Sequence, residues 1–143
     1  MTSIAITEDQ FHEILGNWLD HALPKGSLWH HSPNEGKRHV SYKMRLKKLG
    51  MRSGWPDIEI FVHKDHWWSG IQAPIFLEVK APKRGTLSAN QKAIQAQLLD
   101  LNCAVATVNK LSAAKVFLSA LIELRQDAST KLYESVAERM GCL

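Results

Sequence analysis

The sequence lacks most of the features that mark secreted, membrane-spanning or zinc-binding proteins. It has two cysteines, Cys103 and Cys142, and no CxxC pair, so neither a disulfide framework nor a zinc-ligand spacing is indicated. No apolar run approaches the roughly 20 residues that a transmembrane helix requires. The first residues also lack a basic region followed by an apolar stretch. These absences favour a cytoplasmic protein with two free thiols and no membrane partner.

Internal repeats, low-complexity tracts and Gly/Ser linkers are absent as well. The 143 residues are 45% hydrophobic and 22% charged, an ordinary globular balance. A chain of this length can bury one hydrophobic core. We therefore expect a single domain over residues 1–143.

Acidic residues are missing from one long stretch, residues 36–56, which contains seven basic residues. Such a local excess of positive charge attracts a polyanion such as DNA, and the attraction weakens with salt. A solvated helix face is the alternative interpretation. The candidate DNA-binding residues are Lys37, Arg38, Lys43, Arg45, Lys47, Lys48 and Arg52.

Hydrophobic periodicity predicts helices alternating with strands. Thr7 and Gln10 form a capping-box pattern at the start of the first helix, which should end near Pro24. The later elements are expected at 27–31 (strand), 41–49 (helix), 57–63 and 74–80 (strands), 88–101 (helix), 103–108 (strand), 112–125 and 129–140 (helices). The two middle strands should pair antiparallel, and the crossover helix should make the last strand parallel to 74–80. The expected fold is α/β, a small mixed sheet flanked by helices, with an extra C-terminal helix.

The strand predicted around residues 75–80 has its charged side chains on one face. Alternation directs Ile75, Leu77 and Val79 one way and Glu78 with Lys80 the other. A carboxylate and an ammonium group are costly to bury unless they are used, although a salt bridge at a strand end is the simple alternative.

Asp57 strengthens the functional interpretation. It follows Gly54-Trp55-Pro56 at the start of the preceding strand, and antiparallel pairing brings that start beside the end of the next strand. Asp57 should therefore lie beside Glu78 and Lys80. Two adjacent carboxylates repel each other, and a hard divalent cation, Mg²⁺ by default, is the simplest way to satisfy them.

The order Pro56-Asp57, hairpin, Glu78-Val79-Lys80 resembles the motif of the PD-(D/E)XK nuclease superfamily, and in particular its VRR-NUC domain family. The similarity extends over about residues 8–108 and leaves a C-terminal helical extension of about 111–143 unmatched. The other segments that resemble the family are 29–38, before the basic helix, 46–50 with 53–57, leading into Asp57, and 87–91, after Lys80.

This resemblance implies a restriction-endonuclease-like fold and a set of site residues. Catalytic roles carry over to Asp57, Glu78, Lys80 and Gln91, with Glu8 from the first helix as a further acid and Glu13 in reserve. Mg²⁺, which Mn²⁺ can replace, would be held by Asp57, Glu78 and the backbone carbonyl of Val79. Glu8 has an alternative role at a helix N-terminus. Gln91 has one as the capping partner of Ser88, and the two roles of Gln91 are compatible.

The implied activity is that of a metal-dependent, structure-specific DNA endonuclease acting on branched DNA such as Holliday junctions, as a two-fold homodimer. A restriction- or repair-type nuclease on duplex or flap DNA is one alternative, and a non-catalytic DNA-binding module is another. The proposed dimer contacts are the Trp67-Trp68 loop and the helical face of Leu132, Val136 and Met140. Base stacking is the alternative role of the Trp pair.

Overall fold

The computed structural model describes residues 5–32, 40–83 and 85–143, and within these ranges four strands form one mixed sheet. The strands are β1 (Leu28–His31), β2 (Ile58–Phe61), β3 (Ile75–Val79) and β4 (Ala104–Val108). They lie in chain order, with β1, β2 and β3 antiparallel and β4 parallel to β3. The α/β fold with a small mixed sheet is confirmed, including the predicted direction of the last strand.

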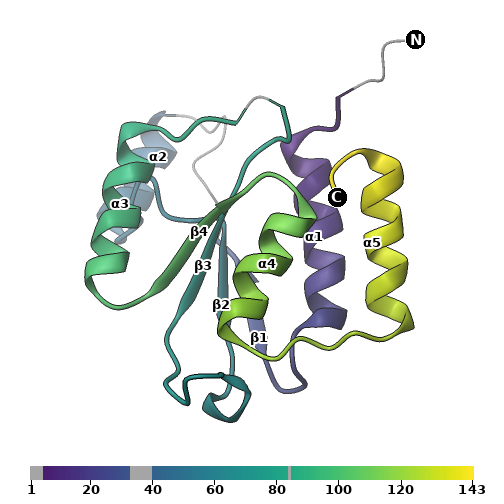
Figure 1. Ribbon diagram of the computed structural model, residues 1–143. Helices are drawn as coiled ribbons and strands as arrows, with labels where there is room; N and C mark the ends of the chain where they lie inside the picture. Colours follow the sequence, from purple (N-terminus) through teal and green to yellow (C-terminus); the bar gives the residue numbers. More distant parts are fainter. Residues whose placement is uncertain (1–4, 33–39, 84) are drawn as a thin grey trace.

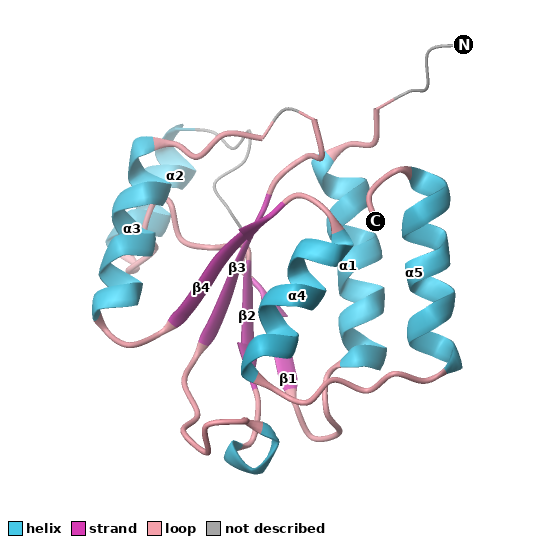
Figure 2. Cartoon of the chain, viewed as in Figure 1, coloured by secondary structure: helices cyan, strands magenta, loops and turns pink. Residues whose placement is uncertain are grey.

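Helices cover both sides of the sheet (Figures 1 and 2). On one side lie α1 (Glu8–Ala22), α4 (Leu111–Leu121) and α5 (Ala128–Met140). On the other lie α2 (Val40–Lys48) and α3 (Ala89–Asp100). The hydrophobic core lies between the sheet and the first group, because Ile58, Ile60 and the odd-numbered residues of β3 point there.

Both ends of α1 are closed by side chains. The Thr7 hydroxyl accepts a hydrogen bond from the Gln10 N–H (3.1 Å) and Gln10 Oε1 accepts one from the Thr7 N–H (2.9 Å), which is the predicted capping box. At the other end, Arg125 donates from Nε to the Leu23 carbonyl (2.6 Å) and from a terminal nitrogen to the Asp20 carbonyl (2.9 Å). The helix that carries Glu8 is therefore fixed on the core.

The helix predicted over 112–125 is wrong at its end, because α4 stops at Leu121. Ile122 instead forms a β-bridge with Trp67, and the N–H of Trp68 donates to the Leu121 carbonyl (3.1 Å). Pairing with the β2–β3 loop thus replaces the last helical turn. Val116, in the middle of α4, is 70% exposed, so this helix is only partly core.

The two adjacent tryptophans of the β2–β3 loop have different environments. Trp67 is 7% exposed in the core, and its Nε1 donates to the Val62 carbonyl (3.0 Å). Trp68 is 64% exposed, and its Nε1 donates to the Ser119 carbonyl (2.8 Å). The expectation that both rings form a surface is wrong for Trp67, which supports the loop from inside.

The predicted C-terminal helix is present as α5, packed along α1 (Figure 1). Asp127 caps its N-terminus by accepting from the N–H groups of Ser129 and Thr130. Val136 is half-buried, whereas Leu132 and Met140 are exposed. Across the described ranges, no helix combines the length and apolar character that crossing a membrane requires.

Candidate active site

The start of β2 and the end of β3 lie side by side at one end of the sheet. Asp57 directly precedes β2, and the register that pairs Ile58 with Leu77 places Asp57 opposite Glu78. Both side chains are buried, with 4% and 1% of their surface exposed. Asp57 Oδ2 accepts a hydrogen bond from the Val79 N–H (2.7 Å). That bond fixes the Asp57 carboxylate against the end of β3.

The two oxygens of Glu78 have unequal surroundings. Oε1 accepts a hydrogen bond from Gln91 Nε2 (2.7 Å) and lies 3.6 Å from Lys80 Nζ. Oε2 is buried and has no hydrogen-bond partner among the described residues. A buried polar oxygen without a partner is costly, so this atom marks a position that a cation would satisfy.

Gln91 connects the site to the start of α3. Its Oε1 accepts from Lys80 Nζ (3.0 Å) and also from the Ser88 N–H (2.8 Å), while Ser88 Oγ accepts from the Gln91 N–H (3.2 Å). The predicted capping box is thus present together with contacts to both Glu78 and Lys80. Helix initiation and side-chain placement at the site depend on the same residue.

The electrostatics of Glu78 reflect its burial. Removal from water, followed by the adjacent Asp57, raises its pKa to about 8, and Lys80 only partly offsets these effects. In the absence of a cation, the pair therefore holds a proton at neutral pH.

Glu8 lies close enough to this pair to interact with it. Burial raises its pKa, Asp57 raises it further and Lys80 lowers it. Glu13 is exposed and lines the same hollow as Glu8 and Asp57. Of the two acids considered in the sequence, Glu8 is the one the structure brings near both Asp57 and Lys80.

The donors fit a hard divalent cation. Asp57 and Glu78 offer carboxylate oxygens. Val79 donates its N–H to Asp57, and because the N–H and C=O of one strand residue point the same way, its carbonyl is expected on that side of β3 as well. No group of three or more metal-binding side chains occurs within the described ranges. Mg²⁺ is commonly bound by one or two carboxylates and keeps several waters, so this set is sufficient.

Two histidines at the site were not predicted. His31 Nδ1 donates to the Asp57 carbonyl (3.0 Å), and the His12 ring packs edge-on against His31 with centroids 4.4 Å apart. Burial lowers the pKa of His12. A signal was available, because Glu8 and His12 are separated by four residues and so share one helix face.

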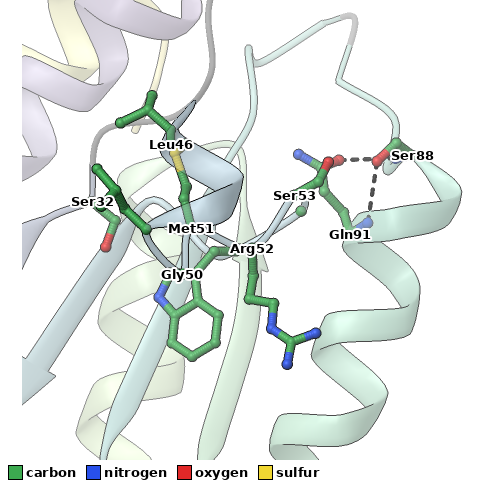
Figure 3. Close-up of a pocket in the computed structure, with 11 residues that line it drawn as sticks. Ser32, Leu46, Gly50, Met51, Arg52, Ser53, Ser88 and Gln91 are labelled. Atoms are coloured by element: carbon green, nitrogen blue, oxygen red, sulfur yellow. Dashed lines mark hydrogen bonds between the residues drawn. The ribbon is translucent and has the colours of Figure 1, made fainter. Parts of the chain in front are cut away.

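A groove of about 610 Å³ opens beside the site, between α2, the following loop and the start of α3 (Figure 3). Gln91 belongs to its lining. Its other lining residues are Ser32, Leu46, Leu49, Gly50, Met51, Arg52, Ser53, Gly54, Trp55 and Ser88.

The loop before Asp57 docks on α3 through Gly54. This residue has φ +85°, and a Cβ atom there would lie 2.6 Å from the backbone carbon of Asn90. Asn90 Nδ2 also donates to Ser53 Oγ (3.1 Å). Only glycine satisfies both the left-handed backbone and the close approach.

Five of the predicted DNA-binding residues lie on or just after α2. Lys43 is half-buried, whereas Arg45, Lys47, Lys48 and Arg52 are exposed. The helix contains no acidic residue. Lys37 and Arg38 lie outside the described residues.

Comparison with known proteins agrees with this architecture. No family model and no curated protein matches the sequence. A solved structure described as a "VRR_NUC domain protein" superimposes with a TM-score of 0.60 at 20% sequence identity, over 82% of this chain and 92% of the other. The fold expected from the sequence is confirmed: this chain has the fold of a VRR-NUC domain, which is restriction-endonuclease-like.

Proposed function

We propose that this protein is a Mg²⁺-dependent DNA endonuclease whose active site comprises Asp57, Glu78, Lys80 and Gln91, with Glu8 at its margin. The observation that carries the proposal is the pair of buried, opposed carboxyl groups at Asp57 and Glu78, in which Glu78 Oε2 has no partner among the described residues. The nuclease-type fold supports the same chemistry. A protein that only bound DNA would have no use for clustered carboxylates beside the phosphates.

Asp57, Glu78 and the Val79 carbonyl would hold the metal. When bound, Mg²⁺ supplies a Lewis acid for the scissile phosphate and lowers the pKa of a coordinated water. The protein's own contribution is orientation. The Val79 N–H fixes Asp57, and Gln91 fixes Glu78 through a 2.7 Å hydrogen bond.

Lys80 is placed to handle charge on the substrate. Its ammonium group is held by Gln91 Oε1 at 3.0 Å and lies 3.6 Å from Glu78 Oε1. From this position it stabilises negative charge that develops on the phosphate, or orients the attacking water. Preorganised donors of this kind require no rearrangement during the reaction.

The substrate we propose is branched DNA such as a Holliday junction, cut by a homodimer. The support is the resemblance of the sequence to stand-alone VRR-NUC nucleases. The basic residues of α2 would bind the phosphate backbone without reading sequence.

The test is incubation with Mg²⁺ and labelled duplex, flap and four-way junction DNA. We expect the wild type to cleave the junction, and EDTA to abolish this cleavage. Asp57→Asn, Glu78→Gln and Lys80→Met should each eliminate cleavage. Each variant should still unfold in a cooperative thermal transition. If duplex or flap DNA is cut faster than the junction, that DNA is the substrate and the proposed one is wrong. A folded wild-type chain that binds DNA and cuts none of these substrates would contradict the activity itself.

Gln91→Leu tests the positioning role separately. Losing a residue that orients the metal-binding groups typically reduces activity about 10- to 100-fold, and we expect that loss here. The matched control is Asp127→Ala, which also removes a helix cap and costs about 1 kcal/mol, but acts at the start of α5, where Asp127 accepts from the Ser129 and Thr130 N–H groups. Equal activity of the two variants would show that Gln91 acts only as a cap.

A further inference from the structure

We propose that the groove beside Gln91 binds the base of an unpaired nucleotide next to the bond that is cut. This inference rests on the proposed nuclease function and specifies the substrate feature that the protein recognises. It is carried by the chemistry of the groove, by its charge and by its connection to the candidate active site.

The groove offers a largely apolar lining. Leu46, Leu49, Met51 and Trp55 contribute to it, and its volume of about 610 Å³ falls within the range usual for small-molecule sites. Leu49 is 72% exposed and α2 buries none of its residues. Within the described ranges this apolar surface therefore remains uncovered, which is typical of a binding surface.

Trp55 is the aromatic element of the lining, and it is held in place from two sides. Its Nε1 donates to Glu59 Oε1 (2.7 Å), and its ring meets Phe76 edge-on with centroids 5.6 Å apart and an interplanar angle of 87°. The ring is half-buried, so part of it faces the groove. A fixed aromatic ring is a stacking platform that accepts any base.

The charge of the groove selects an anionic ligand. Arg52 lines it, and none of its described lining residues is acidic. The adjoining helix α2 adds Arg45, Lys47 and Lys48 without an acidic residue. The ligand should therefore have a flat aromatic group that stacks on Trp55 and a negative charge that pairs with Arg52. A nucleotide has both, in its base and its phosphate.

Gln91 makes the groove and the site continuous. Its side chain lines the groove and contacts Glu78 and Lys80, at 2.7 and 3.0 Å. A nucleotide whose phosphate lies at those residues would therefore have its base beside the groove. In a duplex both faces of a base are covered by its neighbours, so only an unpaired or extruded base can enter.

The test is a binding measurement in EDTA, without cleavage. Two DNA duplexes of identical length and phosphate number carry the fluorescent base 2-aminopurine, opposite thymine in one and opposite an abasic position in the other. We expect the unpaired version to bind at least about fivefold more tightly, the lower limit for stacking one base on an aromatic ring. Its fluorescence should also be quenched on binding.

Trp55→Ala should abolish the preference and the quenching, and Trp55→Phe should retain most of both. Because Trp55→Ala also removes contacts to Glu59 and Phe76, Leu49→Asp provides a second test at an exposed position. Its matched control is Val40→Asp, which introduces the same charge at a position of α2 that is 68% exposed and does not line the groove. Only Leu49→Asp should reduce the preference for the unpaired base.

Equal affinity for the two duplexes would overturn the inference. So would a Leu49→Asp variant that changes the oligomeric state and leaves the preference intact, because the groove would then be an interface between copies. Failure of the proposed function is distinguishable: a chain that shows the base preference but never cuts DNA contradicts only the nuclease assignment. A chain that cuts DNA without the preference contradicts only this inference.

Discussion

Glu78 shows how a single buried carboxyl group would link stability to the proposed metal binding. Its Oε1 is bonded to Gln91, whereas its Oε2 has no partner among the described residues. With the pKa raised to about 8, the group remains protonated at neutral pH until a cation displaces the proton. Binding of the proposed Mg²⁺ would therefore change the charge of the protein at this residue.

The first prediction concerns pH. The pKa of Glu78 is about 8 in the folded state, and its ordinary value is 4.5. Between pH 4.5 and about pH 8, the folded state therefore keeps a proton on Glu78 that the unfolded state has already lost. Stability in EDTA should therefore fall as pH rises through this window. Melting temperatures at about pH 5 and about pH 8 measure the effect, and Glu78→Gln should flatten the slope. A wild-type slope equal to that of the variant would contradict the assignment.

At this scale the proximity of the candidate site residues could be predicted from the sequence, whereas their catalytic roles stay a prediction. Asp57, Glu78, Lys80 and Gln91 lie on consecutive elements whose pairing follows from a hairpin and a capping box. His12 and His31 were missed, because the position of His31 depends on β1 joining the sheet next to β2. That pairing spans residues far apart in the chain and leaves little local signal.

At the scale of elements, the loop from residue 50 to 55 determines where α3 begins. Gly54 lies against the backbone of Asn90, and Gln91 is the next residue of the helix. The position of Gln91, and with it that of Lys80, thus depends on how closely two main chains approach. Backbone contact of this kind tolerates no side chain.

The second prediction compares two glycines. Gly54 and Gly50 both have positive φ, +85° and +103°, but a Cβ at Gly50 would meet nothing within 4 Å. Gly50→Ala should cost only the strain of a left-handed backbone, about 1–2 kcal/mol. Gly54→Ala should cost more and should also reduce cleavage, because it displaces α3. Denaturant unfolding and cleavage rates check this, and similar results for both variants would contradict it.

The third prediction concerns α2. If its basic residues bind phosphates, the slope of log affinity against log salt should be about −0.9 per contact. Lys47→Glu combined with Lys48→Glu should make the slope shallower. Lys131→Glu with Arg139→Glu, two exposed positions on α5, is the matched control and should change it less. Identical slopes for both double variants would show that the α2 charges are only solvated.

Element boundaries were predictable where a capping residue marks them and failed where tertiary pairing intervenes. Ser88 and Gln91 correctly predict the start of α3. The end of α4 could not be found, because the bridge between Ile122 and Trp67 joins segments over fifty residues apart. The same pairing takes Trp67 out of the surface that its sequence neighbour Trp68 occupies.

The whole molecule raises the question of assembly, since cutting a junction symmetrically requires two active sites. A two-fold dimer supplies both through one self-complementary interface. Of the dimer contacts predicted from the sequence, Trp68 on the loop and Leu132 and Met140 on α5 are exposed. Trp67 is excluded by its burial.

The fourth prediction is that light scattering at micromolar concentration gives about twice the chain mass of 16.1 kDa. Trp68→Ser, or Leu132→Ser with Met140→Ser, should shift the mass toward one chain, depending on which patch forms the contact. Leu101→Ser, at a position 71% exposed on the other side of the sheet, is the control. A wild-type monomer that still makes paired cuts in a junction would refute the dimer.

The two helical layers differ in how much of their surface is buried, and this difference should set how fast their backbone amide hydrogens exchange with solvent. Helix α1 buries seven of its residues, whereas α3 buries only Leu98 and α2 buries none. Elements with little buried surface open locally at a small cost in free energy, while a core helix opens only with the whole domain. Backbone amide hydrogens of α2 will thus exchange with solvent long before those of α1. If α2 binds the DNA as proposed, DNA should slow that exchange, and this half of the molecule would then become fully rigid only in the complex.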